Sequence, residues 1–180
     1  ILRENKKGGL RTAFCYRPAI INLEDFFLLL KDYPDAYVLI DSKQYSLRNY
    51  QRTLEDYSDY VEIARNAGAG ETLDRIIPEI YEAMFPGTAM LYSFPSYVYS
   101  LWQEYSVEEL EYIASFCKEK GIPAATVYWE YWSEETEKIF EKNGISLYVY
   151  TVNDRDQARR YISQGAEGIC TDFLTAEDLW

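Results

Sequence analysis

Residues 146–173 read SLYVYTVNDRDQARRYISQGAEGICTDF, and this stretch decides the fold that the sequence predicts. Its first part, Ser146–Val152, is an apolar run of aromatic and β-branched residues, which is typical of a strand buried on both faces. A second, short strand is expected at Ile169–Phe173, after a helical segment. Together these elements make one βαβ unit, and such units join parallel strands by a right-handed crossover.

Polar residues mark the ends of the helix inside this unit. Asp154, with Gln157 three residues later, predicts a helix N-cap and a capping box, and Gly165 predicts the helix end. Asn153 and Asp172 stand at the ends of the two strands. Both residue types are common turn formers, so a purely structural role for them stays open beside a functional one.

The same alternation of strands and helices recurs along the rest of the chain. Helices are predicted after the capping residues Asn22, Ser106 and Ser133 and over Leu47–Ala67, with one helical turn at Glu82–Phe85. Further strands are predicted at Ala36–Ile40, Arg75–Tyr81, Ser96–Gln103 and Ala124–Trp129, with a weaker signal at Leu10–Tyr16. Six strands, each leading toward a helix, predict an α/β fold with a parallel sheet in one domain over residues 1–180.

Composition excludes several classes of function. The formal net charge of −12 disfavours binding to nucleic acid or to anionic membrane surfaces. Cys15, Cys117 and Cys170 have no metal-binding spacing, so neither a zinc site nor a disulfide framework is expected. The sequence contains no histidine, which excludes a Ser-His-Asp or Cys-His site and a histidine-ligated metal within these residues. No signal peptide or transmembrane run is recognisable, and no compartment follows from this.

Polar residues stand near the predicted end of each successive strand: Asp41, Glu79, Gln103, Glu130, Asn153 and Asp172. In a parallel α/β sheet or barrel these strand ends lie on one face, where active sites are built. The sequence therefore predicts that these side chains face a common mouth.

Two pairs of segments resemble the glycerophosphodiester phosphodiesterase family. The first pair is Thr151-Val152-Asn153 with GAEGICTDF at 165–173, and the second is Asn22-Leu23-Glu24-Asp25 with Leu39-Ile40-Asp41-Ser42-Lys43. The resemblance covers residues 20–174. It implies a TIM-type (β/α) barrel, related to the phosphatidylinositol-specific phospholipases C, of which this sequence holds six of the eight βα units.

The resemblance also implies an activity, the hydrolysis of phosphoric diesters with a glycerophosphodiester-like small molecule as substrate. Asp41 would bind a divalent cation, Ca²⁺ or Mg²⁺, and Lys43 would face the substrate phosphate, where the family has a Glu-x-Lys pair. Carboxylates and hard cations suit each other, and a lysine neutralises a phosphate oxygen. An Asp-x-Lys at a strand end is also often a plain ion pair, so that alternative stays open.

Further strand-end groups are predicted to contact the substrate, and no residue is assigned a catalytic role. These contact residues are Glu79, Tyr81, Gln103, Tyr150 and Asn153, in addition to Lys43. Trp102, Trp129 and Trp132 are further candidates for the pocket wall. For each aromatic residue the alternative is ordinary packing between helix and strand.

The family's first two strands carry histidines, a glutamate and a Glu-x-Asp pair, and none of these elements is in this sequence. Two explanations stay open: the chain is an N-terminally truncated phosphodiesterase, or it is a non-catalytic binding or structural module that retained the barrel. In both cases we expect the chain as given to be inactive. A barrel with six strands has open edges, which we expect to be covered by a missing N-terminal piece, by self-association with a second copy of the chain, or by Leu10–Tyr16. An unrelated α/β barrel enzyme is a third alternative.

Overall fold

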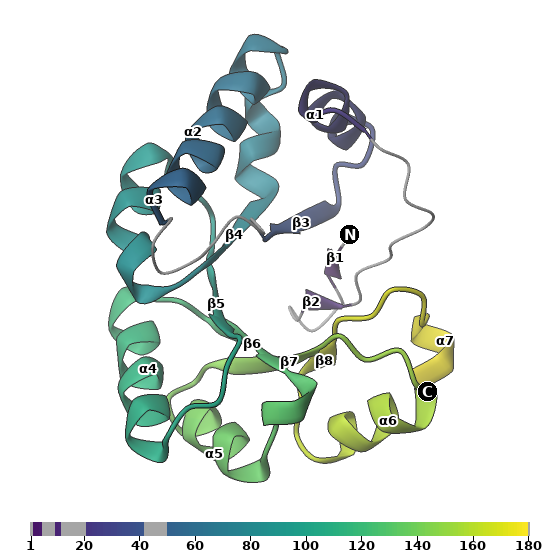
Figure 1. Ribbon diagram of the computed structural model, residues 1–180. Coiled ribbons are helices and arrows are strands. Elements are labelled where there is room, and N and C mark those ends of the chain that lie inside the picture. The colour runs from purple at the N-terminus through teal and green to yellow at the C-terminus, as the bar shows by residue number, and fades with distance from the viewer. Residues whose placement is uncertain (1, 5–9, 12–20, 42–49, 180) are drawn as a thin grey trace. The chain divides into compact units, whose positions relative to one another are not determined.

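The computed structural model describes residues 2–4, 10–11, 21–41 and 50–179 of the 180-residue chain (Figure 1). The contacts between its residues divide the chain into two compact units. Pro18–Tyr97 is here named the β3–β4 unit, and Ile1–Arg17 with Val98–Trp180 the β5–β8 unit. Each unit contains its own parallel strands and its own helices.

The β3–β4 unit alternates helices with two parallel strands. The strands are β3 (Ala36–Ile40) and β4 (Ile76–Ile80), paired with Val38 opposite Ile76 and Ile40 opposite Pro78. The helices are α1 (Leu23–Lys31), α2 (Tyr50–Asn66) and α3 (Phe85–Leu91), and the 3-10 turns are η1 (Gly70–Arg75) and η2 (Glu82–Met84).

A buried core lies between these helices and one face of the two strands. Phe27 of α1 and Ile76 of β4 are fully buried in it, and Val38 and Ile40 of β3 pack against it. Side chains alternate between the two faces of a strand. The intervening residues of β3 and β4, among them Glu79, therefore point to the face opposite the core.

Both ends of α1 are fixed by side chains. The predicted cap at Asn22 is confirmed, because its Oδ1 accepts the backbone N–H of Asp25 at 2.8 Å. Beyond the other end, the Arg75 guanidinium donates to the backbone oxygens of Leu30 at 2.8 Å and Ala36 at 3.3 Å. Arg75 was predicted to open β4, but it ends η1 instead and ties that turn to α1.

The β5–β8 unit contains four parallel strands, each followed by a helix. The strands pair in the order β5 (Val98–Leu101), β6 (Ala124–Tyr128), β7 (Ser146–Tyr150) and β8 (Gly168–Ile169). The helices are α4 (Val107–Lys120), α5 (Glu134–Lys142), α6 (Arg155–Ser163) and α7 (Ala176–Leu179), and η3 (Trp129–Tyr131) is a 3-10 turn. An antiparallel pair, β1 (Leu2–Glu4) and β2 (Leu10–Arg11), belongs to the same unit.

The two faces of these four strands have different surroundings. Helices α4, α5 and α6 lie on one side (Figure 1). The ring of Tyr99 in β5 contacts that of Phe116 in α4, with centroids 6.2 Å apart, so Tyr99 and its register partner Ala125 face the helices. By strand alternation, Tyr128 of β6 and Tyr150 of β7 point to the opposite face.

The predicted helix starts in this unit are confirmed by their caps. Ser106 forms a full capping box at the start of α4, and Ser133 caps α5. Asp154 caps α6 through a 2.8 Å bond from the backbone N–H of Gln157. The predicted capping box at Gln157 is wrong, because its side-chain amide donates to the Tyr161 hydroxyl instead.

The α/β class and the parallel pairing within each unit are confirmed, but several boundaries differ from prediction. Residues 85–91 form the helix α3, where the sequence predicted only a single turn ending at Phe85. Pro86 and Gly87 lower the helical signal there, although proline fits the first turn of a helix. Gln103 lies beyond β5, Trp129 begins η3, and Asp172 lies beyond β8.

The cysteines carry no functional signal in the described part of the chain. Cys117 and Cys170 are both free thiols. Cys117 is buried in α4, and burial raises the pKa of its thiol to about 12, so it is an unreactive core residue. Cys170 follows β8 and is half-buried, and Cys15 lies outside the described residues. Among the described helices, none is both long and apolar enough to cross a membrane.

Candidate functional site

Two of the predicted site residues are carboxylates at neighbouring strand ends of the β3–β4 unit. Glu79 lies in β4, and Asp41 directly follows β3. Because Ile40 pairs with Pro78, the next step of the parallel register places Asp41 beside Glu79. Glu79 is only 8% exposed, whereas Asp41 is exposed. The pair thus combines one buried and one accessible carboxylate.

Tyr57 of α2 fastens the two strand ends that carry these carboxylates. Its side chain is fully buried, and its hydroxyl lies 2.7 Å from the backbone oxygen of Glu79 and 3.1 Å from that of Ile40. Burial, followed by the charges of Glu79 and Asp41, raises the pKa of Tyr57 far above the ordinary value. The phenol therefore keeps its proton and donates it to the strand ends.

The other two predicted site residues of this unit, Tyr81 and Lys43, add little to the description of the site. Tyr81 follows β4 and occupies the N-cap position of η2, where it is half-buried. Lys43 lies outside the described residues. The ion-pair alternative for Asp41 and Lys43 is therefore a prediction that the structure does not address.

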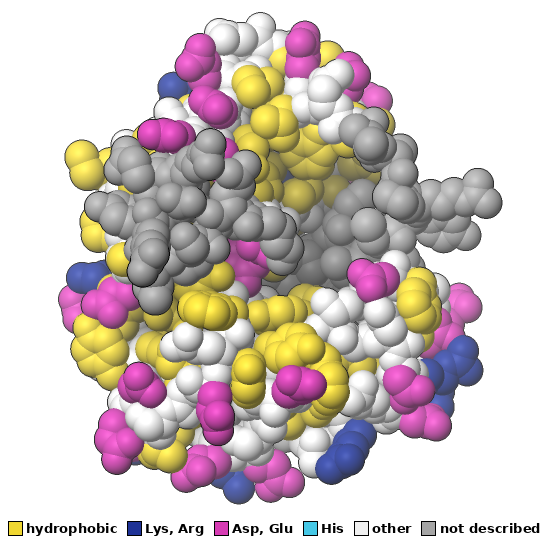
Figure 2. Space-filling view, in the orientation of Figure 1, with side chains coloured by type: hydrophobic (Ala, Val, Ile, Leu, Met, Phe, Trp, Pro, Cys, Tyr) yellow, Lys and Arg dark blue, Asp and Glu magenta, His cyan; other side chains and the backbone are white. Residues whose placement is uncertain are grey.

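Tyr150, a predicted contact residue, lies in a group of four aromatic side chains in the β5–β8 unit. The ring of Tyr128 is at the centre of the group, and its centroid is 5.7 Å from Trp129, 5.6 Å from Tyr131 and 5.8 Å from Tyr150. All four rings are half-buried. We name these residues the Tyr128 group. In Figure 2, hydrophobic side chains gather over β6, β7 and η3, the elements that supply them.

A further tyrosine, Tyr148, lies on the same face of β7 as Tyr150. Its ring covers Gly168 of β8, where a Cβ atom would lie 2.8 Å from Cδ1 and Cε1 of the tyrosine. Burial raises the pKa of Tyr148 to about 12, with smaller contributions from Glu167 and Cys170. The face opposite the helices is therefore lined with tyrosine rings below the predicted mouth.

Asn153 links the segments that follow β7 and β8. Its Oδ1 accepts the backbone N–H of Asp172 at 2.9 Å and the Thr171 hydroxyl at 3.0 Å. Its Nδ2 donates to the Asp172 carboxylate at 2.7 Å. Both atoms of the amide are thus bound within the protein, and the structural role that the sequence left open for Asn153 and Asp172 is present. A contact of Asn153 with substrate stays a prediction.

Gln103 lines a cavity of about 250 Å³ between the segments that follow β5 and β6. Trp132 lines the same cavity, and its ring packs edge-on against Tyr161 of α6. Trp102 is exposed after β5, and Trp129 belongs to the Tyr128 group. The three tryptophan candidates therefore lie in different environments within the β5–β8 unit.

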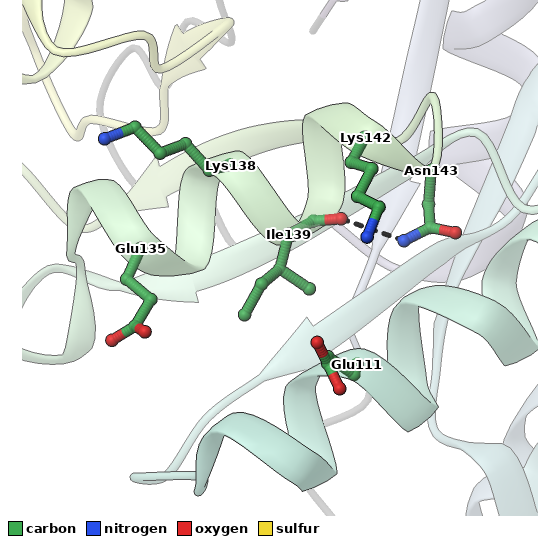
Figure 3. Close-up of a pocket in the computed structure, with 6 residues that line it drawn as sticks. All are labelled: Glu111, Glu135, Lys138, Ile139, Lys142 and Asn143. Carbon is green, nitrogen blue, oxygen red and sulfur yellow. Dashed lines mark hydrogen bonds between the residues drawn. The ribbon is translucent and has the colours of Figure 1, made fainter.

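A larger groove, of about 590 Å³, runs between α4 and α5 (Figure 3). Glu111 and Glu135 line it together with Lys138 and Lys142, so its charges balance. Asn143 at its end donates to the backbone oxygen of Ile139 at 2.9 Å. All its lining residues come from the helices, and none from a strand end, so this groove is separate from the predicted mouth.

The residues that the structure describes include no cluster of three or more potential metal ligands. Asp41 and Glu79 therefore supply two carboxylates to any cation bound there. Ca²⁺ and Mg²⁺ take six or more oxygen ligands, so most of the coordination would have to come from water or a ligand.

Sequence reasoning missed Tyr57, Tyr128, Tyr131 and Tyr148. Tyr57 falls in the middle of a predicted helix, and nothing local distinguishes it from Tyr60. Tyr128 was included in a predicted strand, and its register partner Tyr150 was recognised only through the resemblance. The one available signal for this group in the sequence was an aromatic residue at the same position of two successive strands, Tyr128 and Tyr150.

Comparison with known proteins shows which family the pattern in the second half of the sequence resembles. Residues 103–176 match the sequence model of the glycerophosphoryl diester phosphodiesterase family. This match confirms the resemblance to that family, on a stretch that includes the Tyr128 group and the Asn153 link. No curated protein sequence matches the chain.

Solved structures with the same fold belong to the same class of protein. A glycerophosphodiester phosphodiesterase from Parabacteroides distasonis superimposes with a TM-score of 0.61 at 17% identity, over 83% of this chain and 59% of that one. An Oleispira antarctica phosphodiesterase, solved with its product sn-glycerol-3-phosphate, gives 0.59 at 10% identity over 84% and 57%. A Silicibacter pomeroyi structure gives 0.61 at 15% identity over 84% and 52%. These likenesses confirm the barrel fold, and this chain spans little more than half of each structure.

Proposed function

We propose that this chain is a phosphoric diester hydrolase-type domain that binds a glycerophosphodiester-like small molecule at the carboxyl ends of its parallel strands. The observation that carries the proposal is the family match over residues 103–176, which contains the tyrosine-lined strand ends of β6 and β7. The sn-glycerol-3-phosphate bound to the Oleispira protein supports a ligand of this kind. Active sites of such folds lie at these strand ends.

In this proposal Asp41 holds a divalent cation, Ca²⁺ or Mg²⁺, with Glu79 beside it, and Lys43 faces the phosphate. The exposed carboxylate of Asp41 is accessible to a cation, which supports its assignment. A bound cation would polarise the phosphoryl oxygens. Tyr81, Gln103, Tyr150 and Asn153 contact the remainder of the ligand.

The same proposal holds that the 180-residue chain alone does not hydrolyse its ligand. Phosphodiester cleavage needs one group that removes a proton from the nucleophile and one that protonates the leaving alkoxide. Each such group contributes about 10²–10⁴-fold. The sequence has no histidine, and a carboxylate that binds a cation is a poor base. The alternative function is a non-catalytic binding or structural module that retained the barrel. The hydrogen bonds of Asn153 give that residue a structural role, which suits either function.

Binding of sn-glycerol-3-phosphate to the full chain, measured by calorimetry with and without Ca²⁺, tests the proposal. We expect saturable binding that weakens when Ca²⁺ is removed, and that weakens in Asp41→Ala and Tyr150→Leu. Tyr112→Leu is the matched control, because Tyr112 is exposed on α4, outside the Tyr128 group. Binding that neither Asp41→Ala nor Tyr150→Leu changes would contradict the assigned site.

A further inference from the structure

The cavity between the segments after β5 and β6 has an apolar floor and an acidic rim. Its volume is about 250 Å³. Leu101 and Val127, which pair across β5 and β6, line it and are 1% exposed each. The carboxylate residues Glu104, Glu130 and Glu135 also line it and are exposed. A ligand here would place apolar atoms on the floor and its polar part at the rim.

The charges around this cavity favour a cation. None of its lining residues is a lysine or an arginine. Glu104, Glu130 and Glu135 form no ion pair within the described part of the chain. Helices α4 and α5 both begin at the cavity, and each helix start contributes roughly half a positive charge. Three full negative charges exceed these two partial positive charges, so an anion is disfavoured.

Aromatic side chains add a second preference for a cation. Tyr105, Tyr131 and Trp132 all line the cavity and are half-buried. The faces of such rings attract cations, and tryptophan and tyrosine attract them most strongly. Tyr131 also belongs to the Tyr128 group, which holds its ring against Tyr128 at 5.6 Å. The combination of rings and carboxylates is typical of sites for ammonium groups rather than for bare metal ions.

The side chain of Trp132, which lines the cavity, leaves one buried hydrogen-bond donor unsatisfied. Its indole Nε1 is buried and has no hydrogen-bond partner among the residues that the structure describes. Buried donors in native proteins are almost always paired, so this one calls for an acceptor. The indole N–H can only donate.

We propose that this cavity binds a small organic cation, an alkylammonium or quaternary ammonium group. The methyl or methylene groups lie on Leu101 and Val127, and the charge lies between Tyr131 and the rim carboxylates. This cavity shares Gln103 with the proposed phosphodiester site, but binding of the organic cation needs neither Asp41 nor a divalent cation.

Choline is a suitable probe, and its uncharged isostere 3,3-dimethylbutan-1-ol is the matched control ligand. Binding to the full chain is followed by tryptophan fluorescence and by NMR line shifts. We expect saturable binding of choline, and at least tenfold weaker binding of the alcohol, because the alcohol has the same shape but no charge. The absence of saturable choline binding, or equal binding of the two probes, would overturn the proposal.

Three substitutions locate the binding within the chain. Tyr131→Leu keeps apolar bulk and removes a ring face, so the Kd for choline should rise about two- to thirtyfold. Glu130→Gln removes one rim charge and should also weaken binding, with a smaller salt dependence. Tyr112→Leu, on the exposed part of α4, should change nothing. If Tyr131→Leu fails to fold, Glu130→Gln still decides, because its side chain is exposed. Choline binding that is unchanged in Glu130→Gln and in every folded variant would overturn the proposal.

Discussion

Among single residues, Tyr57 joins the two strand ends that carry the candidate carboxylates, although it contacts no ligand in our account. Its hydroxyl joins backbone oxygens that lie 17 and 22 positions away in the sequence. The first oxygen belongs to Ile40, which directly precedes Asp41, and the second belongs to Glu79 itself. A buried phenol that keeps its proton is well suited to this role, because only the protonated form donates.

We predict that Tyr57→Phe destabilises the protein by about 1–3 kcal/mol, because two buried backbone oxygens lose a donor while the ring is retained. Tyr60→Phe is the matched control on the same helix, since its half-buried hydroxyl should cost less than about 0.5 kcal/mol. Urea denaturation of both variants measures the difference. Equal stability of Tyr57→Phe and wild type would contradict the fastening role.

Gly168 is the second residue whose identity the structure explains. We predict that Gly168→Ala costs about 1–3 kcal/mol, because the new methyl group would collide with the half-buried Tyr148 ring. Gly70→Ala is the control, since the nearest side-chain atom there is 3.6 Å away. In a Tyr148→Ala background the Gly168→Ala cost should fall, which a double-mutant cycle detects. An undiminished cost in that background would show that the ring is not the cause.

At the scale of elements, the C-terminal helix α7 is held by one carboxylate. The backbone N–H and hydroxyl of Thr175 both donate to Asp178, at 2.8 and 2.9 Å, and Arg155 of α6 pairs with the same side chain. These donors, led by Thr175, lower the pKa of Asp178. The folded protein therefore favours the ionised form, and α7 is linked to α6 through it.

This linkage gives a pH dependence with a definite sign. A lowered folded-state pKa stabilises the protein above the pKa of an unfolded aspartate, near 3.9. That contribution is lost as the pH falls through the lowered pKa. We therefore predict that Asp178→Asn is less stable than wild type at neutral pH and that the difference disappears near pH 2, as measured by thermal unfolding. Glu177→Gln, one position away and exposed, should show no such difference. A difference in stability between Asp178→Asn and wild type that persists at low pH would contradict an electrostatic origin of the effect.

Sequence patterns predicted these elements well wherever the signal is local. Ser106 and Asp154 each begin a helix by bonding a neighbour three positions away, so their caps are visible in the sequence. The helix α3 was underestimated because Pro86 and Gly87 mask it. The Asn153 link and the Tyr57 bonds were not predicted, since each depends on residues that only the folded chain brings together. The candidate site was thus predictable in its strand-end carboxylates and not in the groups that fix them.

At the scale of the whole molecule, the sequence resembles a phosphodiesterase family in its fold pattern but contains no histidine. Residues 103–176 match the sequence model of a phosphodiesterase family, yet the 180 residues contain no histidine and carry a net charge of −12. A phosphate diester is itself an anion, so binding it against this charge needs a cation such as Lys43 or a bound metal. We therefore propose, as the central claim, that these 180 residues share part of the barrel fold of phosphodiesterases and do not by themselves turn over a phosphodiester.

The release of glycerol phosphate from glycerophosphocholine by the 180-residue chain tests this claim most directly. The assay is run with Ca²⁺ and with Mg²⁺, and Asp41→Ala serves as the control. We predict no release above that of buffer for either protein, because the sequence has no histidine and a carboxylate that binds a cation is a poor base. Release by the wild type that Asp41→Ala abolishes would contradict the account and would show a mechanism without histidine.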